Sequence, residues 1–298
     1  MPENEYQEWT DAIDEYFLIK ESGFDPFHVF TYLSGKEYEF YKDLVGRFDH
    51  VIIAMGFALT DPKRFDQPAD YFRYLFIQRT ISSIRTINDM YKNRYDGDCL
   101  SITRTLYEAY LRMKLLRLDP TSAERFEAKL AYETGLYKTT IRKNGKPNYD
   151  VVFDPKTGKE FEIAISNREI LEISDFPLEV ELYHDLYPLL SGFVHPDLIG
   201  VATKSVTSTR SKASSEEDPV RAAVFVASVC VLLLLEISVS NFLRKKTKRD
   251  VSHVLRKLGG ALVRLITSET VLSRAISPPS IYRLFGFDVE VAKSSRTT

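Results

Sequence analysis

The chain has 298 residues, of which 44% are hydrophobic and 28% charged, and its formal net charge is −2. This composition is typical of a folded globular protein; it excludes a disordered chain and a protein that attracts nucleic acid through its overall charge. Cys99 and Cys230 are its two cysteines, which excludes a disulfide framework or a cysteine-based zinc motif. With an acidic N-terminus that lacks a signal-peptide apolar region, they favour a cytoplasmic location.

Apolar residues recur at three- and four-residue spacing along most of the chain, which predicts a mainly α fold, a multi-helix bundle. The first expected helix, residues 5–21, is short, acidic and amphipathic. Longer helices are expected over 27–59 and 68–95. The turn sequence Asp96-Gly97-Asp98 follows, so the next helix, 98–118, is expected to return antiparallel.

The middle of the chain changes character. A helix is expected over residues 122–141, and turn residues then bracket two short runs that are typical of strands. We interpret residues 144–165 as a small β-hairpin inserted in the helical protein, with a mobile loop as the alternative. The helical pattern resumes near Pro177, and a polar, Ser/Thr-rich segment at 203–218 predicts a flexible loop.

The longest apolar run, Ala222 to Leu243, is preceded by Pro219 at a position that predicts the start of a helix. It is nearly long enough to span a bilayer, but Glu236 in its second half would cost roughly 2.5–3.5 kcal/mol near a bilayer centre. We therefore expect the core helix of a bundle and no membrane contact, with a single span at 222–243 as the minor alternative. In a bundle, Glu236 is the candidate acid facing Arg104 or His195.

These elements suggest three regions. Residues 1–62 form an N-terminal helical region, residues 63–268 the helical bundle core, and residues 269–298 a C-terminal tail. The hairpin near 144–165 and the loop at 203–218 are insertions in the core region.

Arg104 and Glu108 form the most informative pair in the sequence. On a helical period they share a narrow stripe with leucines, so we expect both charges to point inward. Two readings stay open. They form a structural ion pair worth a few tenths of a kcal/mol, about 0.2–0.5 in isolated helices, or they are kept together to act on a third group.

His195 follows a helical segment and precedes Pro196, so it lies at a helix end or turn. A histidine there could act as a general base or proton donor near neutral pH, or it could be a capping or packing residue. Ser191 lies one helical turn earlier and could hydrogen-bond to it. A serine hydrolase is not expected, because no Gly-x-Ser-x-Gly elbow is present.

A basic run follows the apolar stretch. We expect it at the C-terminal end of that helix, where cations oppose the macrodipole. It could contact a phosphate backbone or simply be a solvated helix end. No metal site and no cofactor site is expected, because the ligand spacings and glycine-rich phosphate loops are missing. The candidate nucleic-acid-binding residues are Arg244, Lys245, Lys246, Lys248 and Arg249.

Residues 98–110 resemble the hallmark helix of an uncharacterised, mostly bacterial family. That family pairs an Arg-x-x-x-Glu helix with a later Ser-x-x-x-His-Pro element, here Arg104 and Glu108 with Ser191 and His195. The family is distantly similar to HEPN domains, whose members include dimeric, metal-independent ribonucleases of toxin and phage-defence systems. The resemblance implies that these four residues converge between helices, and it implies a homodimer that acts on RNA.

The chain departs from the HEPN nucleases in one respect. Those enzymes carry an arginine followed, after four to six residues, by a histidine on one helix, and His195 has no such arginine upstream. Arg104 would have to be supplied from another helix.

Two functions are therefore weighed. In a metal-independent ribonuclease, His195 would act as acid and base, Arg104 would stabilise the charge on phosphorus, and Glu108 would orient one of them. The alternative is a non-enzymatic helical module that binds protein or nucleic acid, in which the same residues form a structural polar core.

Overall fold

The computed structural model describes residues 33–60, 65–92, 96–194, 212–273 and 277–287. The predicted fold class is confirmed, because this part of the chain is mainly helical with one small antiparallel sheet. The predicted helix at 5–21 and His195 lie outside the described residues, and every structural statement below refers to the part described.

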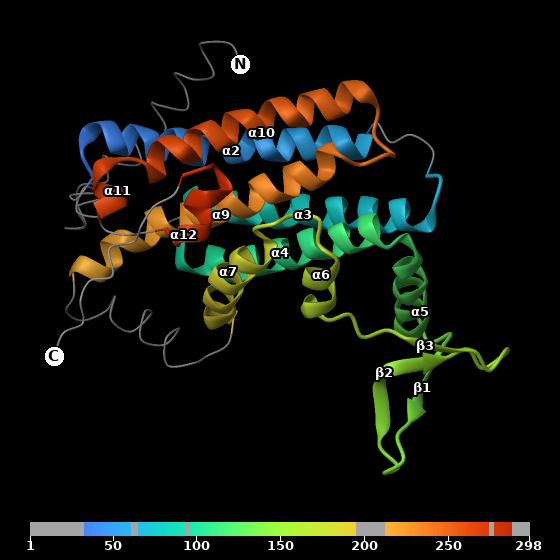
Figure 1. The fold of residues 1–298 in the computed structure, drawn as a ribbon. Helices are drawn as coiled ribbons and strands as arrows, with labels where there is room; N and C mark the ends of the chain where they lie inside the picture. Colours follow the sequence, from blue (N-terminus) through green and yellow to red (C-terminus); the bar gives the residue numbers. More distant parts are fainter. Residues whose placement is uncertain (1–32, 61–64, 93–95, 195–211, 274–276, 288–298) are drawn as a thin grey trace.

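Five long helices form the body of the molecule (Figure 1). Each packs on the next, and the last packs back on the first, so that they close a ring around one hydrophobic core. In chain order they are α2 (Gly35–Thr60), α3 (Pro68–Lys92), α4 (Asp96–Leu118), α9 (Lys212–Ser238) and α10 (Lys245–Ile266).

Helix α2 comes from the predicted N-terminal region and lies within this ring. It contacts α3, α9 and α10, and its residues Leu44, Phe48 and Val51 are fully buried in the common core. The described part of the N-terminal region therefore shares its core with the rest of the bundle.

Helix α9 carries the longest apolar run and lies among α2, α4 and α10. Every residue from 222 to 234 is buried. By length and composition alone, Pro219–Ser238 could cross a membrane. In the bundle most of its side chains are covered by neighbouring helices, as an all-round apolar core helix requires.

Both predicted ends of this helix were wrong. Helix α9 begins at Lys212, so that Pro219 lies inside it and the second part of the predicted loop is helical. The segment Lys-Ala-Ser-Ser-Glu-Glu-Asp includes strong helix formers, which explains the earlier start. The helix ends at Ser238, and Phe242 and Leu243 are buried in the bend that leads to α10.

Shorter helices cover one side of the ring. Helix α6 (Asn167–Ile173) and α7 (Glu179–Val194) pack on α4, and α12 (Pro279–Leu284) packs on α7, while α11 (Glu269–Ser273) follows α10. Helix α6 was not predicted; it is short, and Ser166 caps its first turn by accepting a hydrogen bond from the Glu169 amide. The C-terminal region contributes to the core through Ile281 and Tyr282.

An arm leaves the bundle after α4 (Figure 1). It consists of the short helical turn η3 (Pro120–Ser122), α5 (Ala123–Glu133) and a sheet in the order β1-β2-β3. The strands β1 (Lys138–Ile141), β2 (Pro147–Phe153) and β3 (Glu160–Glu162) are antiparallel. Ala128, Val152 and Ile163 form a small core of its own, separate from the main one.

The predicted hairpin corresponds to β2 and β3, but β1 was missed. Residues 138–141 had been assigned to the helix expected over 122–141. That helix ends at Glu133, and Gly135 with φ 77° then reverses the chain. A glycine just beyond a helix is a common stop signal, because it adopts the left-handed conformation without strain.

Candidate functional site

Arg104 of α4 forms a polar cluster with Glu108 and with Tyr187 of α7. The Arg104 Nε lies 3.1 Å from Glu108 Oε1, and its Nη2 donates a hydrogen bond of 3.1 Å to the Tyr187 hydroxyl. That hydroxyl donates to Glu108 Oε1 at 3.4 Å. The guanidinium also lies over the Tyr187 ring, 5.1 Å from its centre, and the ring of Tyr183 stacks on the other tyrosine at 4.8 Å.

This interhelical cluster is partly open to solvent. The side chain of Arg104 is 18% exposed and that of Glu108 is 37% exposed, so the pair lies at the edge between α4 and α7 and not in the core. Burial lowers the pKa of Arg104, but Tyr187 and Glu108 outweigh it and the net pKa is raised. Arg104 is therefore a fixed cation that a solvent-borne anion could approach.

Ser191 lies on α7 one turn after Tyr187. Its Oγ is buried and has no hydrogen-bond partner among the described residues. Helix α7 ends at Val194, so His195 is the next residue in sequence but falls outside the described part. The structure thus brings Arg104 and Glu108 together, and their convergence with His195 stays a prediction. Tyr187 joins the cluster without any signal in the sequence that marks it.

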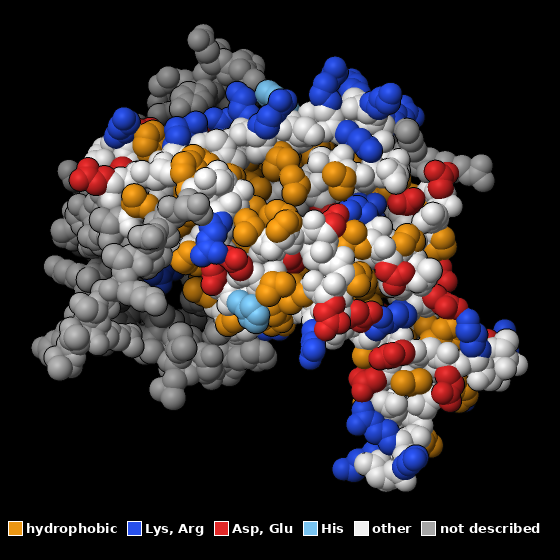
Figure 2. Space-filling model, viewed as in Figure 1, with side chains coloured by type: hydrophobic (Ala, Val, Ile, Leu, Met, Phe, Trp, Pro, Cys, Tyr) orange, Lys and Arg blue, Asp and Glu red, His pale blue; other side chains and the backbone are white. Residues whose placement is uncertain are grey.

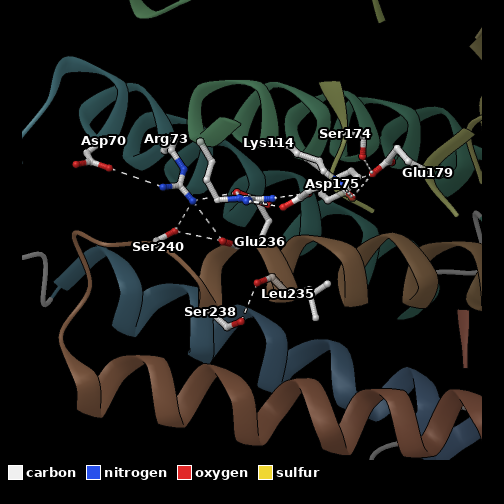
Figure 3. Close-up of polar contacts among 12 residues, drawn as sticks. Asp70, Arg73, Lys114, Ser174, Asp175, Glu179, Leu235, Glu236, Ser238 and Ser240 are labelled. Atoms are coloured by element: carbon white, nitrogen blue, oxygen red, sulfur yellow. Dashed lines mark hydrogen bonds and ion pairs between the residues drawn. The ribbon is translucent and has the colours of Figure 1, made fainter. Parts of the chain in front are cut away.

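Glu236 points into the bundle, but its ion-pair partners are not the predicted Arg104; the other predicted partner, His195, lies outside the described residues. Its carboxylate accepts hydrogen bonds from Arg73 of α3 at 3.0 Å and from Arg117 of α4 at 2.9 and 3.1 Å (Figure 3). Arg73 also donates to the Ser240 hydroxyl at 2.9 Å. Glu236 is 3% exposed, as is Arg73, so this pair is sealed inside the protein.

The charges continue from Glu236 toward α7. Arg117 makes a two-pronged contact with Asp175, at 2.9 and 3.0 Å. Lys114, one turn earlier on α4, lies 2.5 Å from Glu179 and 3.5 Å from Asp175, and Tyr110 donates to Glu179 at 2.7 Å (Figure 3). We call this set the buried polar network; its members are Arg73, Tyr110, Lys114, Arg117, Asp175, Glu179 and Glu236.

The pKa shifts of the network follow from its burial and pairing. Burial raises the pKa of Glu236 even though Arg73 and Arg117 oppose the shift. Burial likewise lowers the pKa of Arg73. Asp175, which is half exposed, has its pKa lowered to about 2 by the hydrogen bonds from Arg117. The network links α3, α4, α7 and α9, so the polar core of this protein consists of residues other than the predicted Arg104 and Glu108.

The basic run lies at the start of α10 and not at the end of the apolar helix, which corrects the expected position. Arg244 is the N-cap residue, and the first turn contains no acidic side chain. Cations at a helix N-terminus are disfavoured by the macrodipole. Their position therefore weakens the fold slightly instead of supporting it.

The exposed side of α10 extends this positive charge along the helix. Its opposite side, with Val251, Leu258 and Leu262, is buried against α2 and α9. Figure 2 shows Lys and Arg side chains along the edge of the molecule where α10 runs. The exposed cations that have no ion-pair partner among the described residues form the α10 basic face; they are Lys245, Lys246, Arg249, Arg256 and Lys257. Arg244 and Lys248 lie in the same two turns.

Among the described residues, no group of three or more His, Cys, Asp or Glu side chains could hold a metal ion. His184 makes an edge-on ring contact with its neighbour Tyr183. Asp185 accepts a hydrogen bond from the Ser280 amide at 3.3 Å. The Asp185 contact therefore joins α7 to α12.

Residues 71–212 match the model of a family of unknown function, DUF5677. The chain has no match among the curated proteins and none among the solved structures. The matched segment starts in α3 and extends beyond α7, so it contains Arg104, Glu108, Ser191 and His195 but not the α10 basic face. The prediction of a relation to an uncharacterised family is thereby confirmed, because residues 71–212 are similar to the family of unknown function DUF5677.

Proposed function

We propose that this protein binds nucleic acid, with RNA as the expected ligand, and that the α10 basic face contacts the phosphate backbone. The observation that carries the proposal is the contrast between charges that are paired and charges that are not. Arg73 and Lys114 each lie against a carboxylate, whereas the cations of the α10 basic face have no described partner. The preference for RNA over DNA comes from the resemblance to HEPN domains.

The geometry of α10 suits a linear polyanion. From Lys245 to Lys257 the helix rises about 18 Å at 1.5 Å per residue. That length corresponds to roughly five nucleotide steps of 3.4 Å in a duplex. The N-terminal end of the helix adds partial positive charge from its free amides. A phosphate chain laid along this face would relieve repulsion among the cations and release counterions.

Binding can be tested with a charge-neutralised variant, Lys245→Gln/Arg249→Gln/Arg256→Gln. We expect weaker binding of a labelled 20-nucleotide RNA in fluorescence anisotropy, and a slope of log affinity against log salt that falls by about one per lost phosphate contact. The matched control is Lys42→Gln/Lys129→Gln/Arg168→Gln, which removes three exposed cations elsewhere. Equal affinity and slope in the two variants would contradict the proposal, and single-stranded DNA of the same sequence tests the preference for RNA.

A second candidate function is metal-independent cleavage of RNA at the interhelical cluster. It is favoured by one observation: Arg104 is held by Glu108 and Tyr187 yet its side chain is still 18% exposed, on the family-matched segment that runs on to His195. The 2′-oxygen would attack the adjacent phosphorus while the bond to the 5′-oxygen breaks. His195 would take the proton from the 2′-hydroxyl and return one to the 5′-oxygen, and Arg104 would stabilise the added negative charge.

Cleavage is tested by incubating RNA with the protein in EDTA and separating the products by length. We expect His195→Ala and Arg104→Ala to abolish cleavage while binding through α10 is retained. Cleavage by the His195→Ala variant at the wild-type rate, or none by either protein, would remove this candidate and leave the binding proposal standing. The homodimer, the cytoplasmic location and a role in toxin or phage-defence systems rest on the sequence and stay predictions.

A further inference from the structure

The arm has its own ion pairs and its own small core, and it holds the β1–β2 hairpin away from the bundle (Figure 1). Lys159 is paired with Glu124 of α5, and Arg125 is paired with Glu169 at the start of α6. Val152 of β2 is fully buried in the arm's own core. The hairpin is therefore fixed at its base, while its far end is directed away from the bundle (Figure 1).

The far end of the hairpin is positively charged. Residues 138–153 contain four basic residues and one acidic residue, in a chain whose formal net charge is −2. Arg142 is paired with the acidic residue, Asp150, at 2.9 Å. The other three, Lys138, Lys143 and Lys146, are exposed and have no ion-pair partner among the described residues. Lys143 and Lys146 lie in the turn at the far end, whereas Lys138 lies at the base of the hairpin, opposite Phe153. Figure 2 shows Lys and Arg side chains at the far end of the arm.

The turn that presents these cations has a defined shape. The Arg142 amide donates to the Lys146 carbonyl at 2.8 Å, and the Asn144 side chain accepts from the Lys146 amide at 3.1 Å. Gly145 has a φ of 76°, which a side chain would strain. The positions of the lysines are thus set by a closed turn.

Two apolar side chains accompany the charge. Ile141 is 75% exposed and Tyr149 is 64% exposed, one on each strand of the hairpin. A narrow ribbon that carries cations at its tip and large side chains on its flanks is suited to a groove with phosphates along both walls.

We propose that the β1–β2 hairpin is a second nucleic-acid contact and that it takes double-stranded nucleic acid, with its tip in a groove. Lys143 and Lys146 contact phosphates on the groove walls, and Ile141 and Tyr149 lie against the sugars. A two-stranded β-ribbon fits the B-form major groove, which is about 12 Å wide, and the wide minor groove of an RNA duplex is likewise open to side chains. A single strand has one phosphate backbone and therefore no groove between two backbones. This inference rests on the proposed function and names the form of the ligand.

The test compares Lys143→Gln/Lys146→Gln with a matched control on the same arm, Lys129→Gln/Lys156→Gln. Both variants remove two exposed cations, and thermal melting checks that both remain folded. Affinity is measured by anisotropy for a 20-base-pair RNA duplex, the corresponding DNA duplex and a single strand, across a salt series. We expect the tip variant to lose affinity for a duplex and about two units of salt slope, with unchanged single-strand binding and an unaffected control.

Equal losses in the tip variant and the control, an equal loss on single strands, or no loss would overturn the inference. Loss on RNA duplex alone, DNA duplex alone or both would support it and identify the duplex. Its failure is separable from that of the proposed function. If only the α10 variant is weak, the hairpin proposal fails; if only the tip variant is weak, the α10 proposal fails; a wild-type protein that binds none of the three ligands overturns both.

Discussion

The buried polar network and the α10 basic face are two sets of charges that the same fold treats in opposite ways. Arg73 and Lys114 are almost fully buried, and each lies within 3.0 Å of a carboxylate. Lys245 and Arg249 are exposed, at the disfavoured end of a helix, with no described partner. Burial requires that a charge be paired, so the first set is explained by folding. Folding does not explain the second set, so these cations are the better candidates for binding a ligand.

The largest expected effect is the loss of one partner from the network. Glu236→Ala would leave Arg73 and Arg117 without their shared carboxylate, and breaking a buried pair in this way costs about 3–5 kcal/mol. Urea denaturation followed by circular dichroism measures the free energy of unfolding. The matched control is Glu172→Ala, whose pair with Arg168 is exposed and should contribute less than about 1 kcal/mol. Similar losses in both variants would remove the distinction between the two sets of charges.

A smaller effect on stability is expected from the interhelical cluster, whose solvent exposure lies between that of the buried polar network and that of the α10 basic face. Arg104→Ala should lower the free energy of unfolding by about 1 kcal/mol or less, because the pair is partly solvated and its helical spacing contributes only a few tenths. A loss as large as that of Glu236→Ala would mean that the cluster is part of a structural polar core, as in the non-enzymatic alternative. Thermal melting of Arg104→Ala beside Glu236→Ala makes the comparison directly.

The solvent-exposed end of the network should show a pH dependence of known sign. Asp175 has a folded pKa of about 2, held down by Arg117, below its ordinary value of 3.8. A group with a depressed pKa stabilises the folded state above the unfolded pKa and loses this contribution as pH falls through the folded pKa. The melting temperature of Asp175→Asn should thus lie below wild type at pH 6, and the two curves should converge toward pH 2. A constant gap across this range would contradict the assignment.

The helical fold class could be predicted from the sequence because the apolar residues of the long helices recur at three- and four-residue spacing. The run in α9 could be placed in the core because its residues are apolar all round. The partners of Glu236 could not be found this way, since Arg73 and Arg117 come from α3 and α4, whose rotation relative to α9 depends on packing. The strand β1 was missed because Lys138–Ile141 is too short to show a period against the preceding helix.

The candidate site could be predicted from the sequence only in part, for similar reasons. Arg104 and Glu108 stand out because they interrupt a leucine stripe, and the family match covers them. Tyr187 carries no such mark, and it joins them only because α7 packs on α4. The basic run was recognised from its composition, but it was assigned to the end of the apolar helix and not to the start of α10, because helix boundaries are the least reliable part of a sequence-based prediction.

The most direct test of this account is one variant measured in two ways. Lys245→Gln/Lys246→Gln/Arg249→Gln removes two cations that the α10 macrodipole disfavours in the first turn and one in the second turn. The melting temperature should therefore stay unchanged or rise, by the equivalent of about 0.3–1 kcal/mol for each first-turn site at low salt. The same variant should bind RNA more weakly and with a smaller salt slope than wild type. A variant that melts lower, or one that binds RNA with wild-type affinity and slope, would contradict the claim that these charges serve a ligand and not the fold.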